Sequence, residues 1–185
     1  MPILGVIASS TRQGQSTDAG AMVPLGMVQV GSGGASTITF SSIPNTYKHL
    51  QIRAIVSNST NTAGYIRFNS DNGSNYARHM VQGTGSSTPT YAAVSQTEMW
   101  FISEINVNPY FSAGVADILD YASTSKNKTM RSFSGVDNNN TSGANAIVLA
   151  SGLWMNNTTA VNSITIFPLG GNFIQYSQFA LYGIK

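Results

Sequence analysis

Four charged residues in the second half of the chain have types and a spacing that could do chemistry together. Asp117 and Asp120 are carboxylates three residues apart, and such a pair could serve as the acid and base of a hydrolase. Folding the chain back about a turn near residue 124, however, places Asp117 opposite Arg131 and Asp120 opposite Lys128 in one antiparallel register. Opposite charges that face each other across strands contribute about 0.2–1 kcal/mol each. We therefore expect two structural cross-strand pairs here and not a catalytic site.

Motifs for other kinds of catalysis are absent from the sequence. The two histidines, His49 and His79, do not have the spacing of a metal-ligand pair, and the chain has no cysteine. Serines are abundant, but no Gly-x-Ser-x-Gly nucleophile motif occurs. We therefore expect a protein that is not an enzyme and that has no metal or cofactor, although an acidic pair converging in one cleft would revive the hydrolase hypothesis.

Two groups of side chains are candidates to contact a partner. His49, Gln51 and Arg53 alternate with apolar residues and therefore share the outer side of one strand. A solvated surface is the simpler interpretation of this row, and contact with a neighbour or a glycan is the alternative. The aromatic side chains of Tyr91, Tyr110 and Phe111 lie in the loop-rich middle of the chain, where they could stack on sugar rings or pack against apolar neighbours.

Composition limits the classes of function. Charged residues make up only 9% of the 185 residues, against about a quarter in an average soluble protein. A net charge of +2 from scattered cations does not indicate a nucleic-acid-binding face. No apolar run is long enough to cross a bilayer, so we expect no membrane association. Residues 1–8 lack the basic start of a signal peptide and are expected to remain in the mature protein.

Short segments of alternating polarity predict the fold. Residues 1–34 are interrupted by polar and breaker residues and end in a Gly-rich joint, which predicts an extended N-terminal arm. Residues 35–185 contain nine or ten period-two segments and no convincing amphipathic helix. Segments 64–69 and 75–81 flank an Asn-Gly pair and predict a hairpin. The expected fold is all-β, a jelly-roll-like antiparallel β-sandwich that follows the arm.

The last strands are apolar on both sides, which is more than one sandwich core can cover. In the segment 146–155, Ala146, Val148, Ala150 and Trp154 alternate with Ile147, Leu149, Leu153 and Met155. A loop, the N-terminal arm or another subunit must therefore cover the second side, and another subunit predicts a homo-oligomer. The predicted interface comprises eight residues: Ile147, Leu149, Leu153, Trp154, Met155, Phe179, Leu181 and Tyr182.

Several stretches of the chain carry a resemblance to known proteins. They include DILDYA at 117–122, KTMRS at 128–132 and GNFIQYSQFALYGIK at 171–185, with further matching pieces upstream in the same order. These stretches resemble small β-rich virion structural proteins of tailed bacteriophages. Residues 83–108 show no such resemblance.

The resemblance implies a structural role in the virion and does not fix where on the particle. The expected function is that of an oligomeric capsid decoration or cement protein, or another particle-attached appendage, with capsid or tail proteins as partners. Phage symmetry suggests a homotrimer. The alternative is the receptor-binding head of a tail fibre or baseplate, which recognises host surface glycans.

Overall fold

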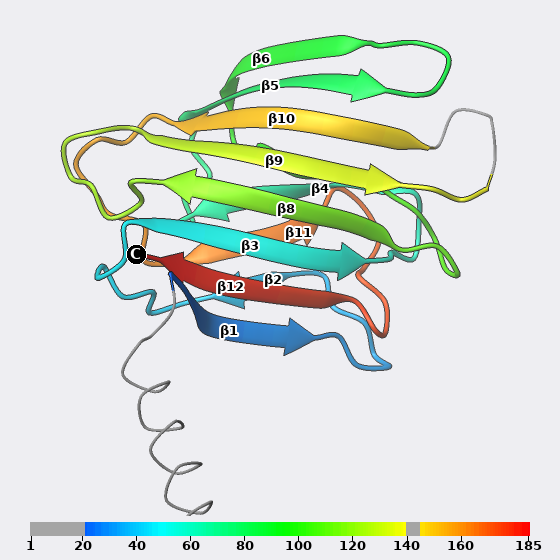
Figure 1. The fold of residues 1–185 in the computed structure, drawn as a ribbon, viewed down its shortest axis with the longest axis horizontal. Helices are drawn as coiled ribbons and strands as arrows, with labels where there is room; N and C mark the ends of the chain where they lie inside the picture. Colours follow the sequence, from blue (N-terminus) through cyan, green and yellow to red (C-terminus); the bar gives the residue numbers. More distant parts are fainter. Residues whose placement is uncertain (1–20, 140–144) are drawn as a thin grey trace, which may run out of the picture.

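The computed structural model describes residues 21–139 and 145–185 of the chain. In these residues, twelve strands form two antiparallel sheets that pack face to face (Figure 1). The predicted all-β sandwich is thus confirmed, with more strands than expected. In chain order the strands are β1 (Met22–Gln29), β2 (Ile38–Phe40), β3 (His49–Val56), β4 (Thr62–Phe68), β5 (Tyr76–Gly83), β6 (Thr90–Gln96), β7 (Met99–Ile105), β8 (Ser112–Leu119), β9 (Lys128–Val136), β10 (Ala146–Trp154), β11 (Ile164–Pro168) and β12 (Gln178–Ile184).

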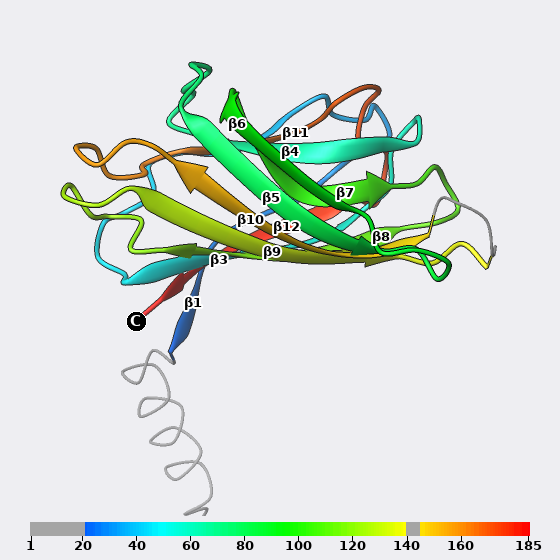
Figure 2. The same cartoon turned by 90° about the horizontal axis from the view of Figure 1, so that it is seen from above.

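The strand order is that of a jelly roll with two added hairpins. The large sheet has the order β1-β12-β3-β8-β9-β10-β5-β6, and the small sheet has the order β2-β11-β4-β7. Strands β1, β12, β3 and β8 of the large sheet and the four strands of the small sheet have the order of the two sheets of a jelly roll, and the chain crosses repeatedly between the two layers. Strand β7 of the small sheet also packs against β9 and β10. The hairpins β5–β6 and β9–β10 both extend the large sheet. Figure 2 shows the two layers from above, with β5 and β6 running at an angle to β9.

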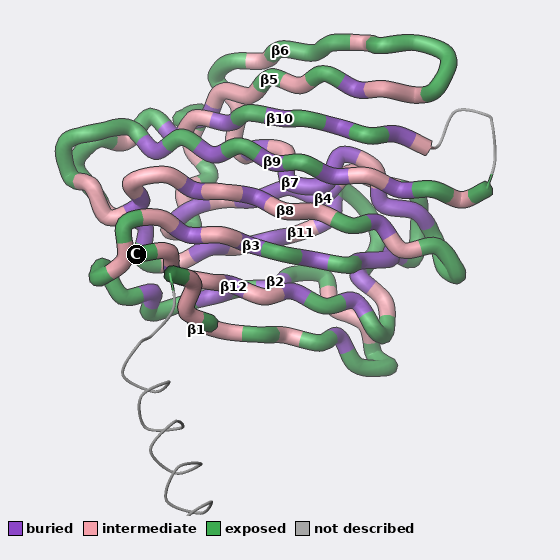
Figure 3. Tube along the Cα trace, in the orientation of Figure 1, coloured by how far each residue is buried: buried purple, intermediate pink, exposed green. Residues whose placement is uncertain are grey.

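Period-two alternation explains the core. On β3, Leu50, Ile52, Ala54 and Val56 point inward and are at most 8% exposed, whereas His49, Gln51 and Arg53 share the outer side. Buried and exposed positions alternate in the same way along β9 and β10 (Figure 3). A large hydrophobic core therefore fills the space between the sheets, and a second, smaller core lies under β10.

The expected arm is shorter than the sequence indicated. Residues 22–29 form β1, which pairs with β12 at the edge of the large sheet, and Val30 is buried. The Gly-rich joint is a turn in which the Gly34 amide donates to the carbonyl of Gly31 at 3.1 Å. This pairing places β1 in the sandwich and not in the arm, so the boundary at residue 34 is corrected. Pro24 is compatible with β1 because β1 is an edge strand. Residues 1–20, the rest of the expected arm, lie outside the described residues.

The two ends of the sandwich meet. The amide of Lys185 donates to the carbonyl of Ala21 at 3.0 Å, next to the first pair of β1 and β12. The first and last strands of the sandwich therefore have their outer ends, at residues 21 and 185, side by side.

The predicted hairpin between β4 and β5 is wrong, because these strands belong to different sheets. Positive φ angles fall on Asn69 and Ser70, not on the Asn-Gly pair, and turn the chain from one layer to the other. The Asp71 carboxylate stabilises this corner by accepting hydrogen bonds from the Gly73 amide at 2.9 Å and from the Trp154 indole at 2.7 Å. The same types of turn residue can therefore form either a hairpin within one sheet or a corner between two sheets.

Candidate functional site

The outer face of the large sheet carries a band of apolar side chains, which we call the outer band. It consists of the exposed residues Ile55, Phe133, Ile147 and Leu149 and the half-buried Val115. Val115, Phe133 and Leu149 are directly opposite one another across β8, β9 and β10, and they form one row. Phe133, Ile147 and Leu149 are 53%, 61% and 55% exposed. Exposed apolar patches of this kind mark contact surfaces.

The eight predicted interface residues differ in exposure and fall into three groups. Ile147, Leu149 and Met155 are exposed, while Leu153 and Tyr182 are half-buried. Trp154, Phe179 and Leu181 are each 1% exposed and belong to the core, so their assignment to the interface is corrected. The physical reason is the strand period: these three side chains are in phase with the inward residues of their strands.

A polar row borders the outer band. Asp117 faces Arg131 in the β8–β9 register, with Nε of Arg131 3.6 Å from a carboxylate oxygen of Asp117. The Gln51 amide donates to the same carboxylate at 2.8 Å, and Arg53 Nε donates to the Gln51 side chain at 2.8 Å. The guanidinium of Arg53 also lies 5.7 Å from the ring centre of Tyr182. Gln51 and Arg53, predicted to face a partner, are therefore engaged with other side chains of this row.

The predicted pair of Asp120 and Lys128 is not present. Asp120 has a φ of 47° and leaves the strand, and its carboxylate binds Lys126 at 2.8 Å. Lys128 is fully buried on the inner side of β9, where its ammonium donates to the carbonyl of Asn156 at 2.8 Å. Lys128 and Arg131 are three residues apart, and a period of two places them on opposite sides of the strand.

The two carboxylates of the discarded acid–base pair each have a cationic partner. Lys126 lowers the pKa of Asp120 by a hydrogen bond and by its charge, and His49 adds to this effect. The Asp120 amide also donates to Nδ1 of His49 at 3.0 Å, which holds the imidazole beside the end of β8. In the described residues, no group of three or more His, Cys, Asp or Glu could hold a metal ion. No helix in this part of the chain is long and apolar enough to span a membrane.

A largely buried charge cluster, which sequence reasoning missed, joins β5 of the large sheet to β4 of the small sheet. Glu98 binds Arg67 and Arg78 at 3.1 Å each, and the Arg78 guanidinium lies 4.4 Å from the ring centre of Trp100. Burial alone would raise the pKa of Glu98. Hydrogen bonds from Thr97 and Arg67 and the two arginine charges outweigh burial and lower this pKa. We interpret the cluster as structural, because Glu98 binds both arginines and the Arg78 guanidinium also donates to the Gln96 side chain at 2.8 Å. The buried Nε of Arg78 has no hydrogen-bond partner among the described residues.

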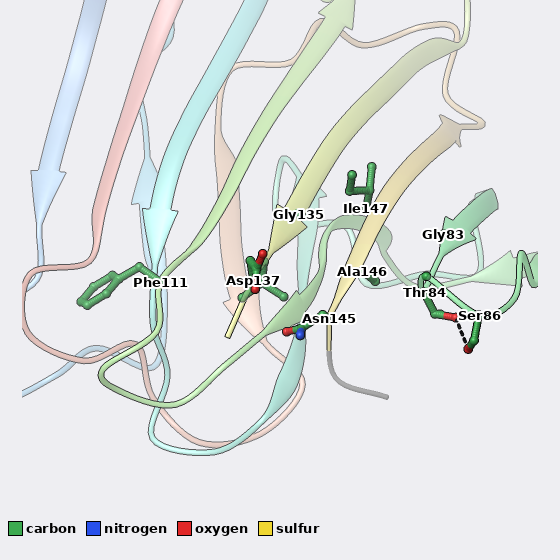
Figure 4. Close-up of a pocket in the computed structure, with 11 residues that line it drawn as sticks. Gly83, Thr84, Ser86, Phe111, Gly135, Asp137, Asn145, Ala146 and Ile147 are labelled. Atoms are coloured by element: carbon green, nitrogen blue, oxygen red, sulfur yellow. Dashed lines mark hydrogen bonds between the residues drawn. The ribbon is translucent and has the colours of Figure 1, made fainter. Parts of the chain in front are cut away.

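Two hollows lie near the hairpin extensions. The first, of about 750 Å³, lies at one end of β9 and β10 and is lined by an aromatic ring and polar side chains (Figure 4). Phe111, Asp137, Asn145, Thr84 and Ser86 contribute to it. Two other aromatic residues are predicted to face a partner. Tyr110 directly precedes Phe111 in the sequence and is 39% exposed, and Tyr91 lies on β6.

The second hollow, of about 830 Å³, lies on the outer face of the large sheet, and we call it the flap groove. Its lining is drawn from β5, β6, β8, β9 and β10. The residues that matter below are Val81, Tyr91, Leu119, Arg131 and Leu149.

Sequence reasoning also missed Phe133 and Ile55. On β9 the inward side carries Lys128, Ser132 and Ser134, so polarity alone does not reveal which side is buried. The register of Asp117 and Arg131 contained the missing signal, because it places Phe133 beside Val115 on the side of Arg131. The outer band could have been found from that pairing.

Comparisons with known proteins do not assign a family. No protein-family model and no curated protein matches the chain. Among solved structures, arcelin-5, a lectin-like defence protein from Phaseolus vulgaris, shows 10% identity over 89% of this chain and 92% of its own, with a TM-score of 0.18. A similarity of this degree carries no argument about function.

Proposed function

We propose that this protein is a virion structural protein of a tailed bacteriophage. In the particle it associates with further copies of itself, as a trimer, and with other virion proteins such as those of the capsid or tail. It acts as a capsid decoration or cement protein or as another appendage. The observation that supports this proposal best is the outer band, a large apolar surface on the outside of a jelly roll that has few charges.

The physical argument rests on burial. Covering a large aliphatic or aromatic side chain contributes about 1.5–3 kcal/mol. The outer band supplies four such side chains that are about half exposed or more, namely Ile55, Phe133, Ile147 and Leu149. Contacts between uncharged surfaces change little with ionic strength, which suits a particle that must survive outside the cell.

Substitution of the outer band tests the self-association. In the Phe133→Asp/Ile147→Asp variant we expect the trimer to dissociate to monomers, because each interface would bury carboxylates without partners. Light scattering after size exclusion measures the mass, and circular dichroism checks the fold. The matched control is Leu169→Asp, an exposed leucine just after β11 that is 71% exposed. A wild-type protein that stays monomeric at every concentration tested would contradict the proposal.

Cryo-electron microscopy of intact virions tests the location. Density for the sandwich repeated over the capsid would support a decoration or cement role, and density at the tail or fibre tip would support an appendage. A particle without this protein, checked by mass spectrometry of purified virions, would overturn the virion assignment.

A second candidate function, the receptor-binding head of a fibre or baseplate, is favoured by the hollow in Figure 4. Phe111 is among the residues that line this hollow together with Asp137 and Asn145, and an aromatic residue beside hydrogen-bonding groups is suited to a sugar. A glycan array measures binding. Phe111→Ala should abolish binding, while Tyr176→Ala, at an aromatic that is 62% exposed in the loop before β12, should not change it. An array without signal would exclude this role for the glycans tested.

A further inference from the structure

The flap groove is an apolar surface that no described segment covers. Val81, Leu119 and Leu149 line it, with Arg131 and His79 contributing polar groups. Leu149 and Val81 are directly opposite each other on β10 and β5 and are 55% and 43% exposed. The groove lies towards the β5–β6 end of the sheet and shares Leu149 with the outer band.

The chain contains one apolar segment outside the described residues. Residues 3–8 have the sequence ILGVIA, without charge and with three β-branched side chains. Residues 9–20 that follow are polar and include only two charged residues, Arg12 and Asp18. An apolar segment at the end of a polar tether has the chemistry of a ligand for an apolar groove.

The tether leaves the sheet at a suitable place. Met22 pairs with Ile184 and Ile184 pairs with His49, whose ring accepts a hydrogen bond from Asp120 beside the groove residue Leu119. The start of β1 is therefore at the same end of the sheet as one side of the groove.

The tether is also long enough. Leu119 on β8 is three strands from β1 and Leu149 on β10 is five strands away, which correspond to about 14 and 24 Å across the sheet. Thirteen extended residues, 9–21, span up to about 43–47 Å. Residues 3–8 can thus reach any part of the groove of their own chain without strain.

We propose that residues 3–8 bind in the flap groove of the same chain and cover it. Intramolecular binding is favoured over binding to a neighbour, since a tether long enough to span the distance gives an effective concentration of millimolar order. This inference goes beyond the proposed function, because it concerns the isolated chain and leaves Phe133, Ile147 and Ile55 of the outer band uncovered for a second copy.

Disulfide trapping tests this proposal, and the absence of native cysteine makes it clean. In the full-length Ile7→Cys/Leu149→Cys variant we expect a disulfide within one chain to form at least about tenfold faster than in Ile7→Cys/Leu169→Cys, where the partner position is more exposed, at 71% against 55%, but lies after β11. Mass spectrometry and non-reducing electrophoresis distinguish a linked monomer from a linked dimer. Mixing the single variants Ile7→Cys and Leu149→Cys should give no linked dimer.

Two results would overturn the proposal. Equal rates for the Leu149 and Leu169 variants would show that residues 3–8 do not prefer the groove. Linked dimers in place of linked monomers would show that the segment binds a neighbouring copy.

Hydrogen exchange supplies an independent readout that introduces no cysteine. In Leu4→Asp/Ile7→Asp we expect amides of β5 and β6 to exchange several-fold faster, while those of β3 and β12 stay unchanged. Unchanged exchange in β5 and β6 would count against the proposal.

Discussion

The two sides of β10 differ in a way that reverses the usual relation between size and burial. The inward side carries the small residues Ala146, Val148, Ala150 and Gly152, and the outward side carries Ile147 and Leu149. The three inward aliphatic residues are at most 4% exposed, and the two outward ones are more than half exposed. From Ala146 to Gly152 the larger side chains therefore lie on the outside, whereas Trp154 at the end of the strand points inward.

The inward side is small because β7 packs closely against it. Ala146, Val148 and Ala150 form a second core with Met80 and Trp100, and a Cβ at Gly152 would lie 2.5 Å from the sulfur of Met99. The outward side has no such neighbour among the described residues. The comparison shows that the small inward side chains of β10 allow β7 to approach closely. The larger apolar side chains on the outer side are suited to contact with another surface.

The largest expected change in stability concerns Trp154, the inward-pointing residue at the end of β10. Trp154→Ala should reduce the free energy of unfolding by about 3–5 kcal/mol, because it opens a cavity and removes the donor that holds Asp71. Leu149→Ala, on the outward side, should change the stability of the monomer by no more than about 0.5 kcal/mol. Urea unfolding of both variants at a concentration where the protein is monomeric provides the measurement. Equal losses would mean that the two sides do not differ in packing.

A smaller difference is expected from adding one methyl group to each side. Gly152→Ala should cost about 1–3 kcal/mol, since Met99 would have to move. Gly135→Ala, on the outer side of β9, would meet its nearest atom at an ordinary 3.5 Å and should be neutral or slightly stabilising. Thermal unfolding of the two variants compares them directly. A destabilised Gly135→Ala variant would show that the outer side is also closely packed.

The last comparison concerns charge, where a half-buried ion pair should matter as much as one methyl group and an exposed pair should matter least. Glu98→Gln should destabilise by about 1–3 kcal/mol, because it leaves the buried Arg78 without its carboxylate. Asp117→Asn should cost no more than about 1 kcal/mol, because the pair is exposed on its Arg131 side.

The Glu98 variant should also respond differently to acid. The pKa of Glu98 is lowered from 4.5 in the folded protein, so the unfolded chain takes up a proton first as the pH falls. The contribution of Glu98 to the free energy of unfolding is therefore complete above pH 4.5, and it is lost as the pH falls towards the pKa of Glu98 in the folded protein. Urea unfolding across this window should show a flatter pH dependence for Glu98→Gln than for the wild type, and parallel curves would refute the assignment.

Much of the fold could be predicted because period two is a local signal. The alternation on β3 identified both its buried and its outer residues, and the charges of Asp117 and Arg131 fixed the β8–β9 register. The alternation on β10 likewise indicated that Ile147 and Leu149 need a cover beyond the sandwich core.

The remainder depends on long-range pairing that a local pattern does not contain. The residues 69–75 have the composition of a hairpin turn, yet the pairing of β4 with β11 and of β5 with β10 makes them a corner. The sequence pattern predicts Lys128 as a surface charge because its burial depends on Trp154 and Asn156, which lie more than twenty residues further along the chain. The same pattern places β1 in the arm because β12, the strand with which it pairs, lies more than 140 residues further along the chain.

The hydrogen bond that joins Lys185 to Ala21 has a practical consequence for engineering. Because the sandwich begins and ends at one point, a short linker could join residue 185 to residue 21 and new ends could be opened in the loop between β5 and β6. Such a circularly permuted chain would keep every strand pair, and a peptide fused at the new ends would be displayed at the far tip of the molecule.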